Sequence, residues 1–128
     1  MNILLNLKQI NTDYIFFGET IKNSIIENGK FTRLIYSDSD MCLNGLHIYF
    51  DTNSINQREM IDLLIELEKI ILFKIDISNK TGQYKIKDYL KWMNSKNYED
   101  YKKYTLKISG IWETTQDYGI TFKFLSNK

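Results

Sequence analysis

The chain of 128 residues contains no proline, alanine or valine, and it has one cysteine, Cys42, and one histidine, His47. A single thiol cannot form an intrachain disulfide, and one thiol with one imidazole cannot supply the ligands of a His/Cys zinc site. The sequence also offers no pairing of a nucleophile with a base that could activate it. We therefore expect a protein that is not an enzyme and that uses no cofactor or metal ion.

Long hydrophobic runs are also absent. The longest uninterrupted run, Ile70–Phe73, is far shorter than the roughly 20 residues of a membrane-spanning helix. Residues 1–8 lack the basic start and the continuous apolar segment of a signal peptide. The phosphate-binding pattern G-x-x-x-x-G-K-S/T, the dinucleotide-binding pattern G-x-G-x-x-G and the nucleophile motif G-x-S-x-G do not occur. We expect a soluble protein that is not secreted and has no membrane partner.

The domain organisation follows from length and composition. Hydrophobic residues make up 43% of the chain and charged residues 26%, which is typical of a globular domain. Repeats, low-complexity segments and Gly/Ser-rich linkers are absent, so nothing marks a domain boundary. We predict a single domain over residues 1–128.

Positive charge is unevenly distributed, although the net charge is only +1. Residues 1–80 carry 8 basic and 11 acidic groups, whereas residues 81–128 carry 9 basic and 5 acidic groups. This asymmetry favours a polar or anionic partner for the C-terminal part. The chain also has 15 Lys against 2 Arg and 12 Asn, a bias that AT-rich codons alone can produce.

The first third of the chain has the pattern of β-strands. Residues 14–17 and 31–36 are rich in aromatic and β-branched residues, and the second segment follows the turn-forming pair Asn28–Gly29. Residues 46–50 alternate between apolar and polar side chains, which is the two-residue period of a half-buried strand.

The next two segments have apolar residues at helical spacing. Ser54 and Gln57 fit a capping box, and beyond them apolar side chains cover a wide face, which predicts a helix from about residue 55 to 73. The spacing of apolar residues over 86–93 predicts a short second helix.

The end of the chain predicts a β-hairpin. Alternation places Leu106, Ile108 and Trp112 on one face of a strand that contains Gly110. A glycine inside a strand often marks a bulge, so Gly110 could bend the hairpin. On the next strand one face carries four apolar residues, namely Tyr118, Ile120, Phe122 and Phe124.

The fold class is therefore α+β. The order of elements predicts a small Greek-key (OB-like) barrel or sheet, with one long helix between the third strand and the C-terminal hairpin. Other α+β sandwiches share this order and remain open.

Lysines and aromatic residues alternate over residues 84–107, and this tract is the first candidate site. Proteins that bind single-stranded nucleic acid combine a cationic groove with rings on which bases stack. The candidates are Tyr84, Lys85, Lys87, Lys91, Trp92, Tyr101, Lys103, Tyr104 and Lys107. The alternative is that the lysines are merely solvated and that many of the rings pack in the core.

The hairpin supplies the remaining candidates. We expect Trp112, Phe122 and Phe124 to pack in the core, and Lys107 and Lys123 to lie on the opposite face. These two lysines are therefore the better contact residues.

Three further features have ordinary structural interpretations. The Asp38, Asp40 and Asn44 segment lacks the spacing of a calcium-binding loop, so we expect a polar loop. His47 is expected to be an exposed structural residue, and Cys42 a small buried hydrophobe.

Two segments of the hairpin resemble a known group of sequences. Residues 107–113 (KISGIWE) and 118–124 (YGITFKF) resemble a signature of small proteins of nucleocytoplasmic large DNA viruses, and residues 31–37 and 43–48 are similar to their N-terminal half. Some of these proteins are similar to phage-type single-stranded-DNA-binding proteins with an OB-fold. The resemblance implies DNA binding and a location in the host cytoplasm (viral factory) or virion. The chain departs from the phage pattern in ending Phe124-Leu-Ser-Asn-Lys128, without an acidic tail.

Two functional hypotheses result. The first is a viral protein that binds single-stranded DNA without catalysis. The alternative is a structural or assembly protein of a viral particle, whose exposed aromatics and sheet edge pair with further copies or with other viral proteins.

Overall fold

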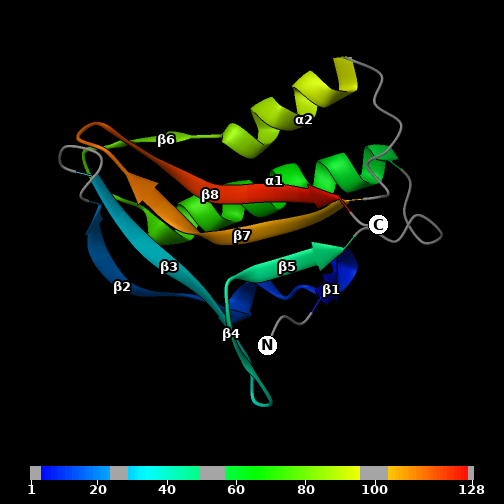
Figure 1. The fold of residues 1–128 in the computed structure, drawn as a ribbon, viewed down its shortest axis with the longest axis horizontal. Helices are drawn as coiled ribbons and strands as arrows, with labels where there is room; N and C mark the ends of the chain where they lie inside the picture. Colours follow the sequence, from blue (N-terminus) through cyan, green and yellow to red (C-terminus); the bar gives the residue numbers. More distant parts are fainter. Residues whose placement is uncertain (1–3, 24–28, 50–56, 96–103, 127–128) are drawn as a thin grey trace.

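In the part of the chain that the structure describes, the fold is one mixed sheet with two helices on one of its faces (Figure 1). The computed structural model describes residues 4–23, 29–49, 57–95 and 104–126. The strands are β1 (Leu4–Asn6), β2 (Ile15–Asn23), β3 (Gly29–Ser37), β4 (Cys42–Asn44), β5 (Leu46–Tyr49), β6 (Thr81–Gln83), β7 (Tyr104–Glu113) and β8 (Asp117–Ser126). The helices are α1 (Gln57–Ile75) and α2 (Lys85–Ser95), and two 3-10 turns, Leu7–Gln9 and Thr12–Tyr14, follow β1. The α+β class and one long helix are confirmed. The helix follows the fifth strand, not the third, and lies between β5 and β6, because the three-residue strands β1, β4 and β6 add to the predicted elements.

Strand β7 organises the sheet. One of its edges pairs along its whole length with β8, and its other edge is shared by β5, opposite residues 105–108, and β3, opposite residues 110–113. The pairs β2–β3, β3–β4, β1–β5 and β6–β8 extend the sheet outward. Within the described residues β1 and β2 do not pair with each other, so the sheet is not closed into a barrel and the OB-like topology is not confirmed.

A glycine makes the corner at which β4 leaves β3 and the chain enters β5. Gly45 has a φ of 84°, and its N–H donates to the carbonyl oxygen of Leu34 at 2.8 Å. A Cβ at this position would lie 2.7 Å from the carbonyl oxygen of Ile108. Only glycine combines the left-handed conformation with this close approach. Gly45 therefore fixes the point at which the chain stops pairing with β3 and begins to pair with β7 as β5.

A bulge at Ser109 reverses the alternation along β7. Ile108 pairs with Phe122 and Gly110 with Thr121, so Ser109 has no partner residue on β8. Ile108 and Ile111 are therefore both fully buried, and Trp112 lies on the opposite face. The expectation that Trp112 shares the core face with Leu106 and Ile108 is wrong, because a two-residue period does not continue through an extra residue.

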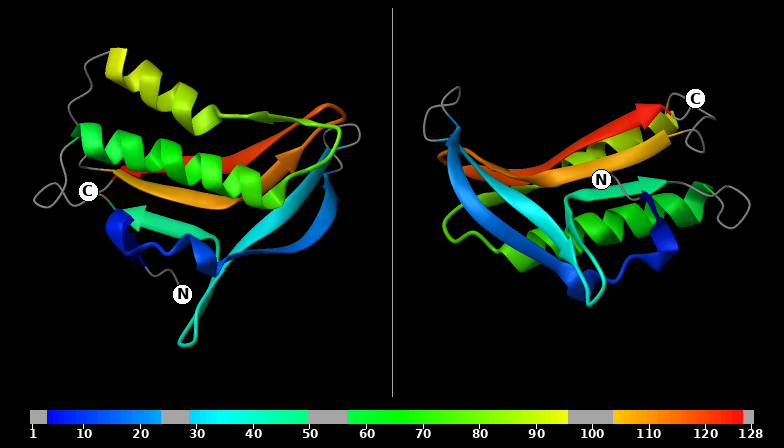
Figure 2. Two further views of the ribbon diagram at one scale, coloured as in Figure 1. Left: turned by 180° about the vertical axis from the view of Figure 1, so that it is seen from behind. Right: turned by 60° about the horizontal axis from the view of Figure 1, so that its bottom comes forward.

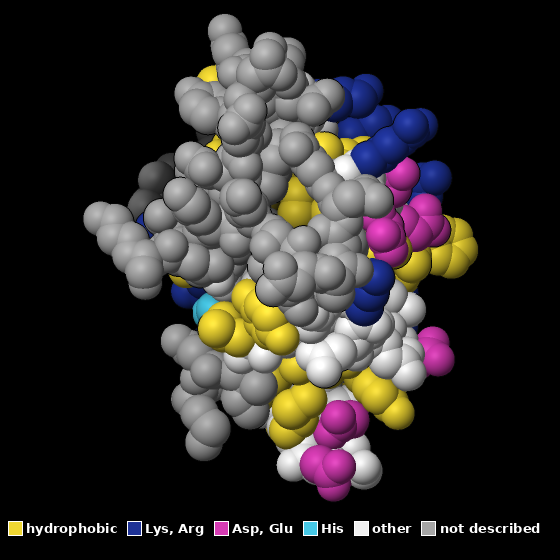
Figure 3. Space-filling view, turned by 90° about the vertical axis from the view of Figure 1, so that its right-hand side faces the viewer, with side chains coloured by type: hydrophobic (Ala, Val, Ile, Leu, Met, Phe, Trp, Pro, Cys, Tyr) yellow, Lys and Arg dark blue, Asp and Glu magenta, His cyan; other side chains and the backbone are white. Residues whose placement is uncertain are grey.

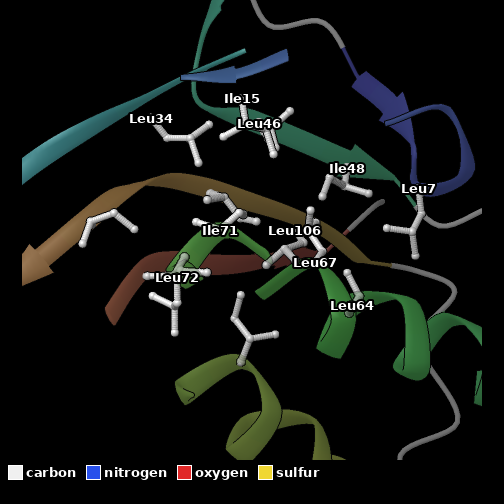
Figure 4. Packing of buried hydrophobic residues seen from close by; sticks show 14 of the residues in the cluster. Leu7, Ile15, Leu34, Leu46, Ile48, Leu64, Leu67, Ile71, Leu72 and Leu106 are labelled. Atoms are coloured by element: carbon white, nitrogen blue, oxygen red, sulfur yellow. The ribbon is translucent and has the colours of Figure 1, made fainter. Parts of the chain in front are cut away.

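The core lies between the sheet and α1, where leucine and isoleucine side chains from both layers interlock (Figure 4). The buried face of α1 includes Leu64, Leu67, Ile71 and Leu72, as its spacing predicts. The helix continues to Ile75, two residues past the predicted end. Its predicted start and the Ser54 cap lie outside the described residues, as does Asn28 of the predicted turn.

The short helix α2 packs beside α1 on the same face of the sheet, as the left view of Figure 2 shows. Ile86 and Leu90 are buried, and the ring of Tyr89 stacks on Phe124 with centroids 4.8 Å apart. The prediction of a helix over residues 86–93 is confirmed. The core position expected for Phe122 and Phe124 also agrees with their packing against the buried cluster.

A buried carboxylate of α1 holds the start of α2. Glu68 is completely buried, and its two carboxylate oxygens accept hydrogen bonds from the backbone N–H groups of Ile86 (2.8 Å) and Lys87 (2.9 Å). A helix start leaves such N–H groups without intrahelical partners, so Glu68 acts as a cap supplied by another helix. Burial raises the pKa of Glu68, while the two backbone hydrogen bonds oppose the rise.

We expect Glu68→Ala to lower the free energy of unfolding by about 3 kcal/mol, because it leaves two N–H donors unsatisfied in the interior. Urea denaturation measures this loss. Glu66→Ala removes an exposed carboxylate from the same helix and should change stability by less than about 0.5 kcal/mol. Equal effects of the two substitutions would show that Glu68 does not anchor α2.

Candidate nucleic-acid interface

The sheet separates the predicted contact residues into two groups. Lys85, Lys87, Lys91 and Trp92 lie on α2, whereas Lys107 and Lys123 lie on β7 and β8 and point away from the helices. Tyr101 and Lys103 lie outside the described residues. Tyr104 begins β7, but its side chain is outside the described part. The basic-aromatic tract is thus not one continuous surface.

Three basic side chains form a row across three neighbouring strands. Lys107 of β7 is the direct partner of Lys123 on β8 and, on its other side, of His47 on β5. Neighbouring strands lie about 4.8 Å apart, so the row spans roughly 10 Å. Both lysines are exposed and His47 is partly buried. We call His47, Lys107 and Lys123 the basic row.

The electrostatics of the basic row favour a bound anion. Like charges directly opposite each other on a sheet destabilise it by roughly 0.2–1 kcal/mol, and Lys107 and Lys123 are such a pair. The pKa of His47 is lowered, first by burial and then by the charge of Lys107. A phosphate placed over the row would relieve the repulsion between the two lysines and favour the protonated form of His47, so these positions suit an anionic ligand.

Two aromatic rings lie on the same face as the basic row, each over a glycine of a neighbouring strand. A Cβ at Gly119 would lie 2.7 Å from Cζ2 of Trp112, and a Cβ at Gly110 would lie 2.7 Å from Cζ of Phe31. Phe31 and Trp112 are direct partners across β3 and β7, and both are partly buried. Glycine therefore allows each ring to rest on the backbone of the next strand.

We call this helix-free side of the sheet, with the basic row, Phe31 and Trp112, the sheet face. As predicted, Lys107 and Lys123 point to the face of the sheet that lies away from Phe122 and Phe124. The prediction that they also lie opposite Trp112 is wrong, because the bulge at Ser109 brings that ring to their side.

The surface of α2 has a mixed charge. Asp88 lies among the three lysines of the helix, and acidic side chains border the basic patch at the upper right of Figure 3, while the imidazole lies apart from it at the left. Trp92 is 49% exposed and its ring contacts Tyr89, with centroids 6.0 Å apart. The aromatic and basic groups are present here, but without a continuous field of one sign.

Three other predicted features have defined places. Cys42 is exposed at the start of β4, so the expectation of a buried thiol is wrong. Asp38 accepts hydrogen bonds at Oδ1 from the N–H groups of Asp40 (2.8 Å) and Met41 (2.9 Å), which agrees with a polar loop. In the described segments, no group of three His, Cys, Asp or Glu side chains could hold a metal ion. Neither described helix is long and apolar enough to cross a membrane.

Comparison with known protein families, with curated proteins and with solved structures gives no match for this chain.

Proposed function

We propose that the protein binds single-stranded DNA on the sheet face and is not an enzyme. The observation that carries this proposal is the basic row beside Phe31 and Trp112 on one side of β3, β5, β7 and β8. Lysines would contact phosphates, and the rings would offer stacking surfaces to bases of any sequence, each worth roughly 1–3 kcal/mol. The α2 group, Lys85, Lys87, Lys91 and Trp92, together with Tyr101, Lys103 and Tyr104, stays a second candidate surface.

The finer parts of the proposal depend on sequence. The order predicted from the sequence, three strands, a long helix and a hairpin, supports an OB-like relationship, although in the structure five strands precede α1 and the sheet is open. The resemblance of residues 107–113 and 118–124 to small proteins of large DNA viruses supports a viral origin and a place in the host cytoplasm or the virion.

The two tryptophans allow a direct test, because Trp92 lies on α2 and Trp112 on the sheet face. The variant Trp92→Phe retains Trp112 as its only tryptophan. We expect its tryptophan fluorescence to change when a 30-residue oligothymidylate is added at low salt. In Trp112→Phe, whose only tryptophan is Trp92, the same titration should give little change. Affinity should fall steeply as salt increases.

A fluorescence change confined to Trp112→Phe would place the DNA on α2 instead. Absence of binding by both variants and by the unsubstituted protein, measured by anisotropy of a labelled oligonucleotide, would contradict the proposal.

His47 predicts a pH dependence of binding. Its pKa lies below the ordinary value of 6.5, so the imidazole is neutral at pH 7 and gains a proton as the pH falls. The added charge completes a row of three cations, so we expect the affinity for oligothymidylate to increase several-fold between pH 7.5 and 5.5. Because the folded state binds this proton less readily than the unfolded state, protein stability should decrease over the same range.

His47→Gln is the matched control, since the amide keeps a polar side chain that does not titrate. Anisotropy titrations at both pH values should give nearly equal affinities for this variant. An unchanged pH dependence in His47→Gln would exclude the imidazole as its source.

An assembly role is the second candidate, and strand β2 favours it. Among the described strands β2 pairs with β3 alone, and it exposes Phe16 (51%) and Ile21 (57%). An apolar edge strand is a ready surface for pairing with another chain. Sedimentation velocity should then show dimers or larger species that Phe16→Ser with Ile21→Ser converts to monomers. A monomer at all concentrations would contradict this role.

A further inference from the structure

A pocket opens on the sheet face where β2, β3 and β4 meet. Its volume is about 240 Å³, and its lining includes Phe31, Arg33 and Ile35 of β3, Glu19 of β2 and Asn44 of β4. This volume is below the roughly 300–1,000 Å³ of pockets that enclose a drug-sized ligand. A single planar ring system therefore suits it better than a whole nucleotide.

The pocket combines an apolar part with three different polar groups. Phe31 and Ile35 supply the apolar part, and Arg33, Glu19 and Asn44 supply a cation, a carboxylate and an amide. Within the described part of the chain, Arg33 and Glu19 form no hydrogen bond or ion pair through their side chains, either with each other or with another residue. Both are exposed, so their hydrogen-bonding capacity is available to a ligand.

The pocket is continuous with the proposed DNA surface. Arg33 is the partner of Gly110 on β7, and Phe31 is the partner of Trp112. Lys107 lies three positions before Gly110 in the chain, with the bulge at Ser109 between them. The distance along β7 is therefore at most about 10 Å, within reach of one short oligonucleotide.

We propose that this pocket receives a guanine base of the single strand bound on the sheet face, an inference that rests on the proposed function. On one edge guanine presents the acceptors O6 and N7, and an arginine can donate hydrogen bonds to both. On the adjoining edge it presents the N1–H and amino donors, and a carboxylate can accept hydrogen bonds from both. Arg33 and Glu19 match these two edges in charge.

The other bases match the pair less well. Adenine carries an amino donor where guanine has O6, and this donor would face the guanidinium. Thymine and cytosine lack N7 and offer the carboxylate fewer donors. The Phe31 ring would contact any base, so discrimination has to come from Arg33 and Glu19.

The test has two arms. In the first, dGMP and dAMP are titrated separately into the protein and followed by NMR shifts of backbone amides in β3. We expect dGMP to bind roughly tenfold more tightly and to shift the amides of residues 31–35. In the second, anisotropy compares a 12-residue oligothymidylate with the same oligomer carrying one central guanine or adenine, and the guanine oligomer should bind roughly tenfold more tightly.

Arg33→Gln and Glu19→Gln should each remove most of the guanine preference and leave the affinity for plain oligothymidylate within about threefold. Lys30→Gln is the matched control, because Lys30 is an exposed cation of the same strand that points to the other side of the sheet. It should keep the preference.

The outcomes separate the two proposals. Equal binding of dGMP and dAMP, or a guanine preference that survives in Arg33→Gln, overturns the guanine pocket even if oligothymidylate binds. Arg33-dependent selection of dGMP without any binding of oligothymidylate would support the pocket and contradict the proposed single-strand function.

Discussion

Gly110→Ala is expected to lower the free energy of unfolding by about 3 kcal/mol. A Cβ at this position would overlap the carbonyl oxygen of Thr32 in the paired strand β3, and it would lie 2.7 Å from Cζ of Phe31. The Thr32 oxygen belongs to the backbone, so β3 and β7 would have to separate where they pair. Forcing atoms into a well-packed interior typically costs about 1–3 kcal/mol, and a displaced strand pair belongs at the upper end.

Gly119→Ala is the matched control, because its Cβ would meet only a side chain, the Trp112 ring, at 2.7 Å from Cζ2. The ring can rotate away, so we expect a loss of about 1 kcal/mol. Urea denaturation of both variants measures the difference. If the two glycine substitutions cost the same, close approach of β3 to β7 is not what requires glycine at position 110.

Reversing both lysines of the basic row should have the largest effect on function. We expect Lys107→Glu with Lys123→Glu to weaken binding of a 30-residue oligothymidylate by more than about 100-fold at low salt, because two phosphate contacts become repulsive. The double variant replaces one like-charge pair on facing strand positions by another. Its melting temperature should therefore stay close to that of the unsubstituted protein.

The corresponding double reversal on α2, Lys87→Glu with Lys91→Glu, changes the net charge by the same amount. We expect it to weaken binding by less than about tenfold, through the long-range field alone. Anisotropy at two salt concentrations measures both variants. Equal losses would indicate attraction to net charge without a defined surface, and a loss confined to the α2 variant would locate the DNA there.

Local sequence patterns predicted the regular elements that bury a continuous apolar face. The apolar spacing over residues 55–73 corresponds to α1, and the alternation on both sides of residues 114–117 corresponds to the β7–β8 hairpin. Each pattern is long enough to show its period. The element that it predicts is formed by residues close together in the chain, either within one helix or within one hairpin. The α+β class follows from these elements.

The short strands were not predictable in this way. β1, β4 and β6 have three residues each, too few to show a period. They are strands because backbone groups of β5, β3 and β8 pair with them. Glu68 gave no signal either, since a carboxylate in a helical pattern ordinarily indicates the solvent side, and its partners at the start of α2 lie 18 and 19 residues away.

Local sequence accounts for the kinds of side chain that are present, namely lysines and aromatic rings concentrated after residue 83, and for the helices and hairpin that carry them. Which of these side chains share a surface depends on contacts between segments far apart in the chain. Register brings His47 beside Lys107 across sixty residues of chain, and the one-residue bulge at Ser109 turns Trp112 from the core to the side of the lysines. Backbone hydrogen bonding between distant strands sets both this register and the position of the Trp112 ring. It does not depend on the charge or the size of the side chains that it aligns.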